Sequence, residues 1–431
     1  MYKLCESRIK TLKFAVSNKN ITKAYLIDRK VEKNCLEISE VYNAARVLRD
    51  VARHPRLIGP TSLCADSEIY LKPENLQRTG SFKLRGAYYK ISQLSPEEKA
   101  RGVVACSAGN HAQGVALGAR AAGIPAYIFL PAGAPVSKIE ATRRLGANVV
   151  LVDGVYDDAY QSAVEEEKQS GLTMIHPFND PKVIAGQGTI GLEILEEMPD
   201  VEAVIVPIGG GGLCAGVAFA VKTLRPEVKV YGVQAEGAPS MYNSLKQGSR
   251  QHLDSVQTIA DGIAVKEPGD LTFDLVSKWV DEVVTVSEDE IANAILALIE
   301  QQKLVAEGAG AVAVAAAMFD KVPIKGKKTV CIVSGGNIDV TSLNRVVSRG
   351  LLKSGRNATL KIDLSDRPGQ LSQACSIIGT HGANILSVIH ERNTPGTPIN
   401  SCVIHVEVET RNEEHIRELK KALSASGFSV V

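Results

Sequence analysis

The stretch of this sequence best suited to binding a ligand is a run of four glycines and a leucine, namely Gly209, Gly210, Gly211, Gly212 and Leu213. The apolar run 204–208 before it is typical of a buried parallel strand, and the residues after it begin a helical pattern. Glycines let backbone N–H groups at a helix start approach an anion closely. The sequence therefore predicts a phosphate-binding turn between a strand and a helix.

The same turn fits a second interpretation. Gly210, Gly212 and Ala215 have the spacing of a dinucleotide-binding fingerprint, and Glu236 follows at about twenty residues, where such folds place an acidic residue. The protein would then be an NAD-dependent oxidoreductase. A glycine loop that only turns tightly is a third interpretation, so the turn alone does not decide the function.

Composition excludes several functional classes. The 431 residues include 49 basic and 48 acidic ones, so the net charge of +1 favours neither a nucleic-acid binder nor a membrane-surface protein. The uncharged runs 203–221 and 308–319 are too interrupted or too short to span a bilayer. The eight cysteines lack a CxxC pair and the eight histidines lack ligand spacing, which predicts reduced thiols, a cytoplasmic protein and no metal.

The elements that must position the glycine turn form a repeating pattern. Strand and helix patterns alternate, with strands expected at 67–71, 103–105, 126–130, 148–152, 203–208, 229–234 and 329–333. Helices are expected at 38–52, 110–122, 136–145, 156–170, 213–223, 239–246 and 337–350. This alternation predicts an α/β body with open, mainly parallel sheets and helices on both faces. Ligands bind such sheets beyond the carboxyl ends of strands, where loops 107–110, 209–212 and 334–337 lie.

Both ends of the chain differ from this body, which we assign to residues 37–352. Residues 1–36 are Lys-rich and irregular, without the apolar core of a secretory signal, and we interpret them as a loosely ordered N-terminal extension or a start site placed too far upstream. Residues 357–431 have the pattern strand, helix, strand, strand, helix, strand. That order is typical of a ferredoxin-like α+β domain.

The chain resembles a known family of enzymes, and this resemblance reduces the number of functions that the sequence allows. Four segments have the order and spacing of fold-type II pyridoxal-phosphate enzymes, and within them of threonine/serine dehydratases: 81–87, 107–114, 209–213 and 334–337. Segments 258–262 and 307–310 add to this resemblance, which covers about residues 40–350. Segments 366–371 and 381–385 resemble one ACT regulatory domain. The whole chain thus resembles the single-ACT form of the threonine ammonia-lyase family.

This resemblance implies a role for each matched residue. Lys83 would form an imine with the aldehyde of pyridoxal 5′-phosphate and act as the base. Phe82 would pack on the pyridine ring, Asn110 would bond its 3′ oxygen, and the glycine turn would hold the phosphate. Ser334 would face the pyridine nitrogen, where a hydroxyl makes the ring a weaker electron sink than an aspartate would.

The resemblance also implies where the substrate and a regulatory amino acid would bind. The substrate carboxylate would meet the backbone of Ser107, Ala108, Gly109, Asn110 and His111 at a helix start. An amino-acid effector, isoleucine or valine, would bind the ACT domain at Arg367, Pro368 and Gly369. The ACT domain could instead serve only structure or assembly, and we expect a homodimer or homotetramer.

The related serine racemases differ at two places. Their second catalytic serine is Ala108 here, and their divalent-metal position carries Gln234 and Ser240. Racemisation and an obligatory Mg²⁺ are therefore not expected.

We thus expect deamination of L-threonine to 2-oxobutanoate and ammonia, with L-serine as a second substrate, because a pocket for threonine's methyl group rarely excludes a smaller analogue. The alternatives are an L-serine dehydratase or serine racemase, an oxidoreductase, and a non-catalytic amino-acid sensor. An oxidoreductase leaves Lys83, Asn110 and Ser334 without roles, and a sensor would not need Lys83. The sequence leaves open whether the duty is biosynthetic or catabolic.

Overall fold

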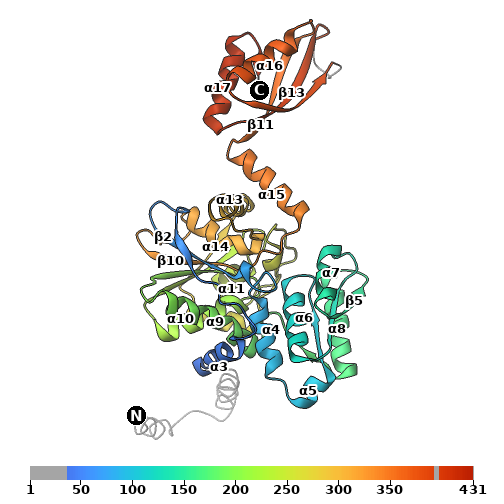
Figure 1. The fold of residues 1–431 in the computed structure, drawn as a ribbon, viewed down its shortest axis with the longest axis vertical. Helices are drawn as coiled ribbons and strands as arrows, with labels where there is room; N and C mark the ends of the chain where they lie inside the picture. Colours follow the sequence, from blue (N-terminus) through green and yellow to red (C-terminus); the bar gives the residue numbers. More distant parts are fainter. Residues whose placement is uncertain (1–35, 393–397, 431) are drawn as a thin grey trace, which may run out of the picture.

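The computed structural model describes residues 36–392 and 398–430 (Figure 1). The prediction for residues 1–36 lies outside this part of the chain, apart from Leu36. Three β-sheets are present in the described residues, two in the body and one in the C-terminal tail. The α/β body and the α+β tail that the sequence predicts are both found.

The larger sheet of the body has six strands in the order β1-β2-β10-β7-β8-β9. Its strands are β1 (Ile58–Thr61), β2 (Glu68–Pro73), β7 (Ala203–Pro207), β8 (Lys229–Ala235), β9 (Glu282–Val286) and β10 (Lys328–Val333). Only β1 runs antiparallel to its neighbour. All residues of β7 are buried, as expected for a central parallel strand covered on both faces.

The smaller sheet of the body is fully parallel, with the order β5-β4-β3-β6. Its strands are β3 (Val103–Cys106), β4 (Ala126–Pro131), β5 (Asn148–Val152) and β6 (Thr173–Met174). The helices that accompany it are α5 (Pro96–Arg101), α6 (Asn110–Ala122), α7 (Val136–Arg144) and α8 (Tyr156–Ser170). This unit lies beside the larger sheet in Figure 1.

The helices around the larger sheet are α3 (Ile38–Leu48), α4 (Lys83–Ser92), α9 (Pro181–Glu197), α10 (Gly212–Leu224), α11 (Ser240–Gln247), α12 (Asp270–Trp279), α13 (Glu288–Ala297), α14 (Gly308–Met318) and α15 (Val340–Lys353). Three short helical segments of other types are also present: the 3-10 helices η1 (Glu74–Leu76) and η2 (Asp261–Ile263), and the π-helix η3 (Leu298–Gln302), which directly follows α13. In α14 every residue from Gly308 to Ala317 is buried, so this helix is part of the core rather than an amphipathic cover.

Glycines let three of these helices approach closely. A Cβ on Gly186 of α9 would lie 2.6 Å from Cα of Gly86 on α4, and one on Gly188 would lie 2.9 Å from the carbonyl oxygen of Gly216 on α10. Helix α9 therefore holds both α4, which begins at Lys83, and α10, which follows the glycine turn. This packing fixes the distance between the lysine and the turn.

The C-terminal tail has the predicted βαββαβ order. Its antiparallel sheet, in the order β12-β13-β11-β14, comprises β11 (Asn357–Ser365), β12 (Asn384–Glu391), β13 (Ser401–Glu409) and β14 (Ser429–Val430). Helices α16 (Gln370–Thr380) and α17 (Glu413–Ala425) pack on it over a hydrophobic core of its own. The tail stands apart from the body at the end of α15 in Figure 1.

Helix α15 forms ion pairs with the body and is therefore part of it. Arg349 and Lys353 of α15 pair with Asp289 at the start of α13, at 2.7 and 3.2 Å. Arg356, between α15 and β11, pairs with Glu300 of the body. Within the described residues, no helix combines the length and apolar character that crossing a bilayer requires.

Candidate active site

The segment that contains Lys83 is joined directly to the loop that contains Ser334. Ser81 and Gly335 form an antiparallel bridge, and the backbone N–H of Phe82 donates to the carbonyl of Ser334 at 3.1 Å. The start of α4 therefore lies against the loop after β10, at the carboxyl end of a parallel strand of the larger sheet. Two of the loops that the sequence singles out thus meet at one place.

Lys83 is the first residue of α4, and its amine has little solvent around it. Nζ donates to the carbonyl oxygen of Pro177 at 2.9 Å and lies 5.3 Å from the ring centroid of Phe82. Burial lowers the pKa of Lys83 to about 8, and the nearby Glu307 opposes this shift. A neutral amine is the nucleophilic form of lysine, so this environment favours attack on a carbonyl group.

Asn110 lies in a chain of side-chain hydrogen bonds. Its Nδ2 donates to Oε1 of Glu307 at 2.6 Å, and its Oδ1 accepts from Nδ2 of Asn337 at 2.7 Å. Nδ2 of Asn337 also donates to the carbonyl of Thr79 at 2.7 Å. The start of α6 (Asn110), the residue before α14 (Glu307) and the loop after β10 (Asn337) are linked in this way.

Glu307 is a buried carboxyl group to which the sequence assigned no role. Burial raises its pKa to about 7, the charge of Asp261 adds to the shift, and the hydrogen bond from Asn110 opposes it. Its segment 307–310 belongs to the resemblance, but the spacing along the chain gives no sign that Glu307 meets Asn110. The sequence likewise indicates Asn337 only as part of a glycine loop.

The buried Ser334 lies close to this chain of hydrogen bonds. Its hydroxyl donates to the carbonyl of Ala309 at 3.1 Å. A hydroxyl can rotate to another acceptor or donor, so this contact leaves Ser334 able to bond a ring nitrogen.

The glycine turn occupies the predicted position between β7 and α10. Gly211 has φ +101°, which a side chain rarely adopts, and a Cβ there would lie 2.8 Å from Cβ of Thr272 and 2.9 Å from Cε of Met241. A Cβ on Gly210 would overlap the ring of Phe178. The N–H groups of the first turn of α10 have no acceptor within the helix, so they suit an anion such as a phosphate.

In the loop after β3, some of the backbone N–H groups predicted to bind the substrate carboxylate already have partners in the protein. The N–H of Ser107 donates to the carbonyl of Phe129, and the N–H of Gly109 donates to the hydroxyl of Ser107, both at 3.1 Å. These two N–H groups are therefore engaged within the protein. Ala108, Asn110 and His111 remain to meet a substrate carboxylate at the start of α6.

Two histidines beside Lys83 are neutral. Burial lowers the pKa of His111 to about 3 and that of His176 to about 4, and the charge of Lys83 lowers both further. Nε2 of His111 lies 2.7 Å from the carbonyl oxygen of Ile175, which requires the proton on Nε2. Neither ring is therefore suited to compete with Lys83 for a proton at neutral pH.

Two buried polar atoms near Lys83 have no partner among the described residues, Oγ of Ser81 and Nδ1 of His111. Such atoms are normally satisfied in a folded protein, so a bound polar molecule or water would complete this site. A desolvated amine, a hydroxyl and a glycine turn at a helix start are the groups that pyridoxal phosphate needs. The site fits this cofactor.

The two units of the body are also linked by charged pairs. Nζ of Lys138 on α7 lies 2.6 Å from Oδ2 of Asp261 in η2, and Lys266 lies 3.7 Å from Asp157 on α8. Asp261 precedes Gly262, whose Cβ would meet Ala309 at 3.0 Å. The two pairs thus connect helices α7 and α8 of the smaller sheet to the segment that contains Asp261 and Gly262, next to Ala309.

Gln234 and Ser240, which the resemblance matches to the divalent-metal position of serine racemases, are fully buried. Oε1 of Gln234 accepts from the N–H of Tyr242 at 2.8 Å, while Nε2 of Gln234 and Oγ of Ser240 have no partner in the described chain. A divalent cation of this class prefers carboxylate and carbonyl oxygens. The amide N–H does not supply such a ligand, so metal independence stays the prediction.

Comparison with known proteins agrees with this geometry. Residues 55–335 match the model of the family described as pyridoxal-phosphate dependent enzymes, and residues 358–425 match that of the ACT domain. The chain therefore belongs to the pyridoxal-phosphate dependent enzymes and carries a C-terminal ACT domain. The fold class is confirmed, and the oxidoreductase interpretation of the glycine turn is not supported.

Individual relatives are more specific. The chain is 53% identical over 398 residues to an L-threonine ammonia-lyase of Thermotoga maritima, covering 92% of this chain and 99% of the relative. The processed threonine deaminase isoform 2 of Solanum lycopersicum has a TM-score of 0.69 and 41% identity, over 72% of this chain and 93% of that one. Maize serine racemase has the same TM-score at 34% identity, over 74% and 98%. The threonine-deaminating relatives are thus the more similar in sequence.

Proposed function

We propose that this protein is an L-threonine ammonia-lyase that converts L-threonine to 2-oxobutanoate and ammonia. The observation that supports this most is the position of Lys83, a desolvated amine where the Ser334 loop, the Asn110 loop and the segment before α9 meet. The similarity to an L-threonine ammonia-lyase over nearly the full length of both chains supports the choice of substrate.

Pyridoxal phosphate, when bound, supplies an aldehyde and an electron-withdrawing ring that acidifies the α-proton of an amino acid. Gly209, Gly210, Gly211, Gly212 and Leu213 would hold its phosphate at the start of α10. Phe82 would pack on one face of the ring, and Ser334 would face its nitrogen. The second hydrogen on Nδ2 of Asn110 is available for the 3′ oxygen.

Lys83 carries the proton chemistry in this proposal. Its pKa of about 8 places a usable fraction of neutral amine near neutral pH, so Nζ can accept the α-proton of the substrate. The N–H groups of Ala108, Asn110 and His111 would orient the carboxylate. Loss of the β-hydroxyl and hydrolysis of the released enamine product then give the oxo acid and ammonia, so one water leaves and one is consumed.

The direct test is an assay of oxo-acid formation from L-threonine and from L-serine by the purified holoenzyme. We expect a higher kcat/KM for L-threonine, visible absorption that borohydride bleaches, and no turnover by a folded Lys83→Ala variant. Preference for L-serine would instead assign an L-serine dehydratase, and D-serine formation a racemase. Substantial dehydration by folded Lys83→Ala would contradict the role of Lys83.

We further propose that the ACT domain binds isoleucine or valine at Arg367, Pro368 and Gly369. Gly369 has φ +91° and precedes α16, whose first N–H groups can meet a carboxylate. A homodimer or homotetramer paired through these domains is expected. The described cysteines are unpaired thiols, which supports a cytoplasmic location.

A further inference from the structure

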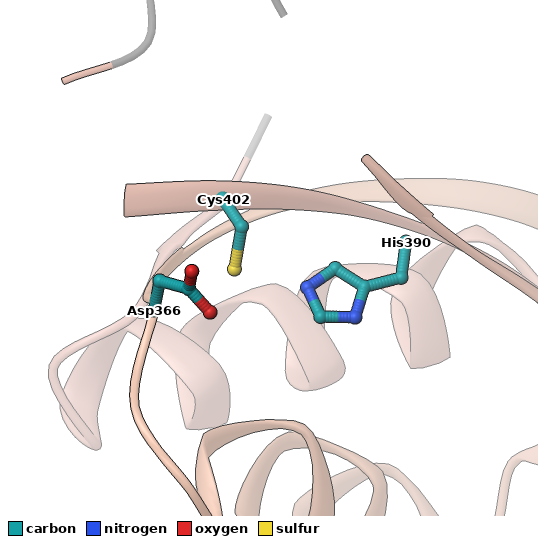
Figure 2. Close-up of side chains that lie close together, drawn as sticks. All are labelled: Asp366, His390 and Cys402. Carbon is teal, nitrogen blue, oxygen red and sulfur yellow. The ribbon is translucent and has the colours of Figure 1, made fainter. Parts of the chain in front are cut away.

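A cluster of three possible metal ligands lies at one end of the ACT sheet, far from the candidate active site along the chain. Asp366 follows β11, His390 is near the end of β12, and Cys402 is the second residue of β13. Figure 2 shows the thiol of Cys402 between the carboxylate of Asp366 and the imidazole of His390. One ligand atom from each residue lies within 4.8 Å of the other two.

The strand register explains why these residues meet. Strand β13 lies between β12 and β11, with Cys402 opposite Leu364 and Ile404 opposite His390. Cys402 and Ile404 are two residues apart on one strand, so the side chains of Cys402 and His390 lie on the same face of the sheet. The N–H of Asp366 donates to the carbonyl of Asn400 at 2.9 Å, which holds the third ligand beside β13.

The chemistry of the three ligands indicates a particular class of ion. A thiolate, an imidazole and a carboxylate together suit Zn²⁺ and similar transition-metal ions, whereas Mg²⁺ and Ca²⁺ prefer oxygen ligands alone. Tetrahedral Zn²⁺ binds these atoms at about 2.0–2.3 Å, so the ligand atoms must move closer together by about 1 Å. Both Asp366 and His390 are exposed and can make this movement, while Cys402 is 2% exposed and holds its place.

The charges would also balance once an ion is bound. When a metal ion displaces the proton of the thiol, the carboxylate and the thiolate together bring two negative charges, which one divalent cation neutralises. Nε of Arg392 lies 3.4 Å from Oδ1 of Asp366. This contact involves one carboxylate oxygen and leaves the other to bind an ion.

We propose that Asp366, His390 and Cys402 form a site for a Zn²⁺-class transition-metal ion, with three protein ligands and a fourth position for water or a small ligand. This site departs from the expectation of no metal, which rested on ligand spacing along the sequence. It also adjoins the loop in which we place the amino-acid effector, but it does not depend on that effector.

The test uses the full-length holoenzyme, reduced and freed of metal with a chelator. Zn²⁺ binding is measured by competition with a chromophoric chelator, and Co²⁺ is added separately to detect a thiolate charge-transfer band. We expect one Zn²⁺ per chain, with an affinity at least about tenfold weaker in Cys402→Ser and His390→Ala, since even residues that only support a metal ligand contribute about 10–100-fold.

Two matched variants control for unspecific effects. Cys375→Ser removes another thiol of the same domain, and His405→Ala removes a histidine on the opposite face of β13. Both should retain wild-type Zn²⁺ affinity and the Co²⁺ band. Equal Zn²⁺ binding by wild type, Cys402→Ser and His390→Ala, all with native circular dichroism, would overturn the proposal, as would no binding to the wild type.

Discussion

At the scale of single residues, the candidate site holds two ionisable groups whose charged forms are both disfavoured by burial. The pKa of Lys83 is lowered to about 8 and that of Glu307 is raised to about 7, so both groups change charge close to neutral pH. The negative charge of Glu307 acts against the shift at Lys83. Their titrations are therefore linked, and a change at one should be measurable at the other.

The reactivity of Lys83 should follow pH with a midpoint near 8. A lysine with a lowered pKa becomes neutral at a lower pH than an ordinary lysine, whose value is 10.5. The rate at which apoenzyme takes up pyridoxal phosphate, followed by visible absorption, should rise through pH 8 and then level off. A rate that keeps rising to pH 10 would contradict the desolvated environment of this amine.

Replacing Glu307 by glutamine should stabilise the protein above pH 7. The native carboxyl keeps its proton up to about pH 7, whereas the unfolded one loses it at about 4.5, so its contribution to stability falls as pH rises between these values. The cost above pH 7 is about 3 kcal/mol, since one pKa unit corresponds to about 1.4 kcal/mol. Glutamine can still accept the hydrogen bond from Asn110.

The predicted stabilisation is tested by measuring the thermal unfolding of Glu307→Gln and of the wild type at several pH values. The difference in Tm should grow between pH 5 and pH 7 and then stay constant. Glu165→Gln, at an exposed position on α8, serves as control and should show no such trend. A difference that does not depend on pH would mean that Glu307 is charged in the folded protein throughout.

At the scale of elements, the sequence patterns predicted the bounds of helices and strands that have an exposed face. The helix expected at 110–122 and the strand at 148–152 have the same bounds in the structure. The pattern could not identify α14, which is apolar on every side because it lies in the core. Nor did it identify α9, where glycines serve close packing against α4 and α10 and weaken the helical signal.

The parts of the site that escaped prediction depend on contacts between distant elements. Asn110 follows β3 of the smaller sheet, whereas Asn337 follows β10 of the larger sheet and Glu307 precedes α14, so their hydrogen bonds join elements that are distant in sequence. The Asp366, His390 and Cys402 cluster forms through strand register, and no two of its members have ligand spacing along the chain. Periodicity describes single elements and contains no information about such pairings.

The glycine turn should tolerate a methyl group poorly. Gly211→Ala places a Cβ at positive φ and also within 2.8–2.9 Å of Thr272 and Met241. Gly123→Ala, at φ +69° with no atom within 4 Å, pays only the backbone cost of about 1–2 kcal/mol and is the matched control. We expect the affinity for pyridoxal phosphate to fall about tenfold or more in Gly211→Ala, equivalent to about 1.4 kcal/mol.

Fluorescence or absorbance titration of the two apoenzymes with the cofactor decides this prediction. Gly123→Ala should retain wild-type cofactor affinity even if its Tm falls. Unchanged affinity in a folded Gly211→Ala would place the phosphate away from this turn.

At the scale of the whole molecule, the body and the ACT domain have separate hydrophobic cores. Helix α15 connects them, and its ion pairs tie it to α13 of the body. An effector on the ACT domain can change catalysis only if it binds one conformational state better than another. Besides α15, the pair between Arg356 and Glu300 joins the segment before β11 to the body.

Ending the chain after Ser354 should therefore separate regulation from catalysis. This cut keeps α15 and every residue that we place in the active site, and it removes a domain that has its own core. The truncated enzyme should retain L-threonine turnover within about threefold, because the cut disturbs only surface contacts of the kind that contribute little. Any effect of isoleucine or valine on its kinetics should be lost. Arg367→Ala in the full-length chain is the control, because it keeps the ACT domain and should weaken only the binding of the effector.

If the full-length enzyme has the same kinetics with and without isoleucine and valine, and calorimetry detects no binding of either amino acid, the proposal of a branched-chain effector is wrong.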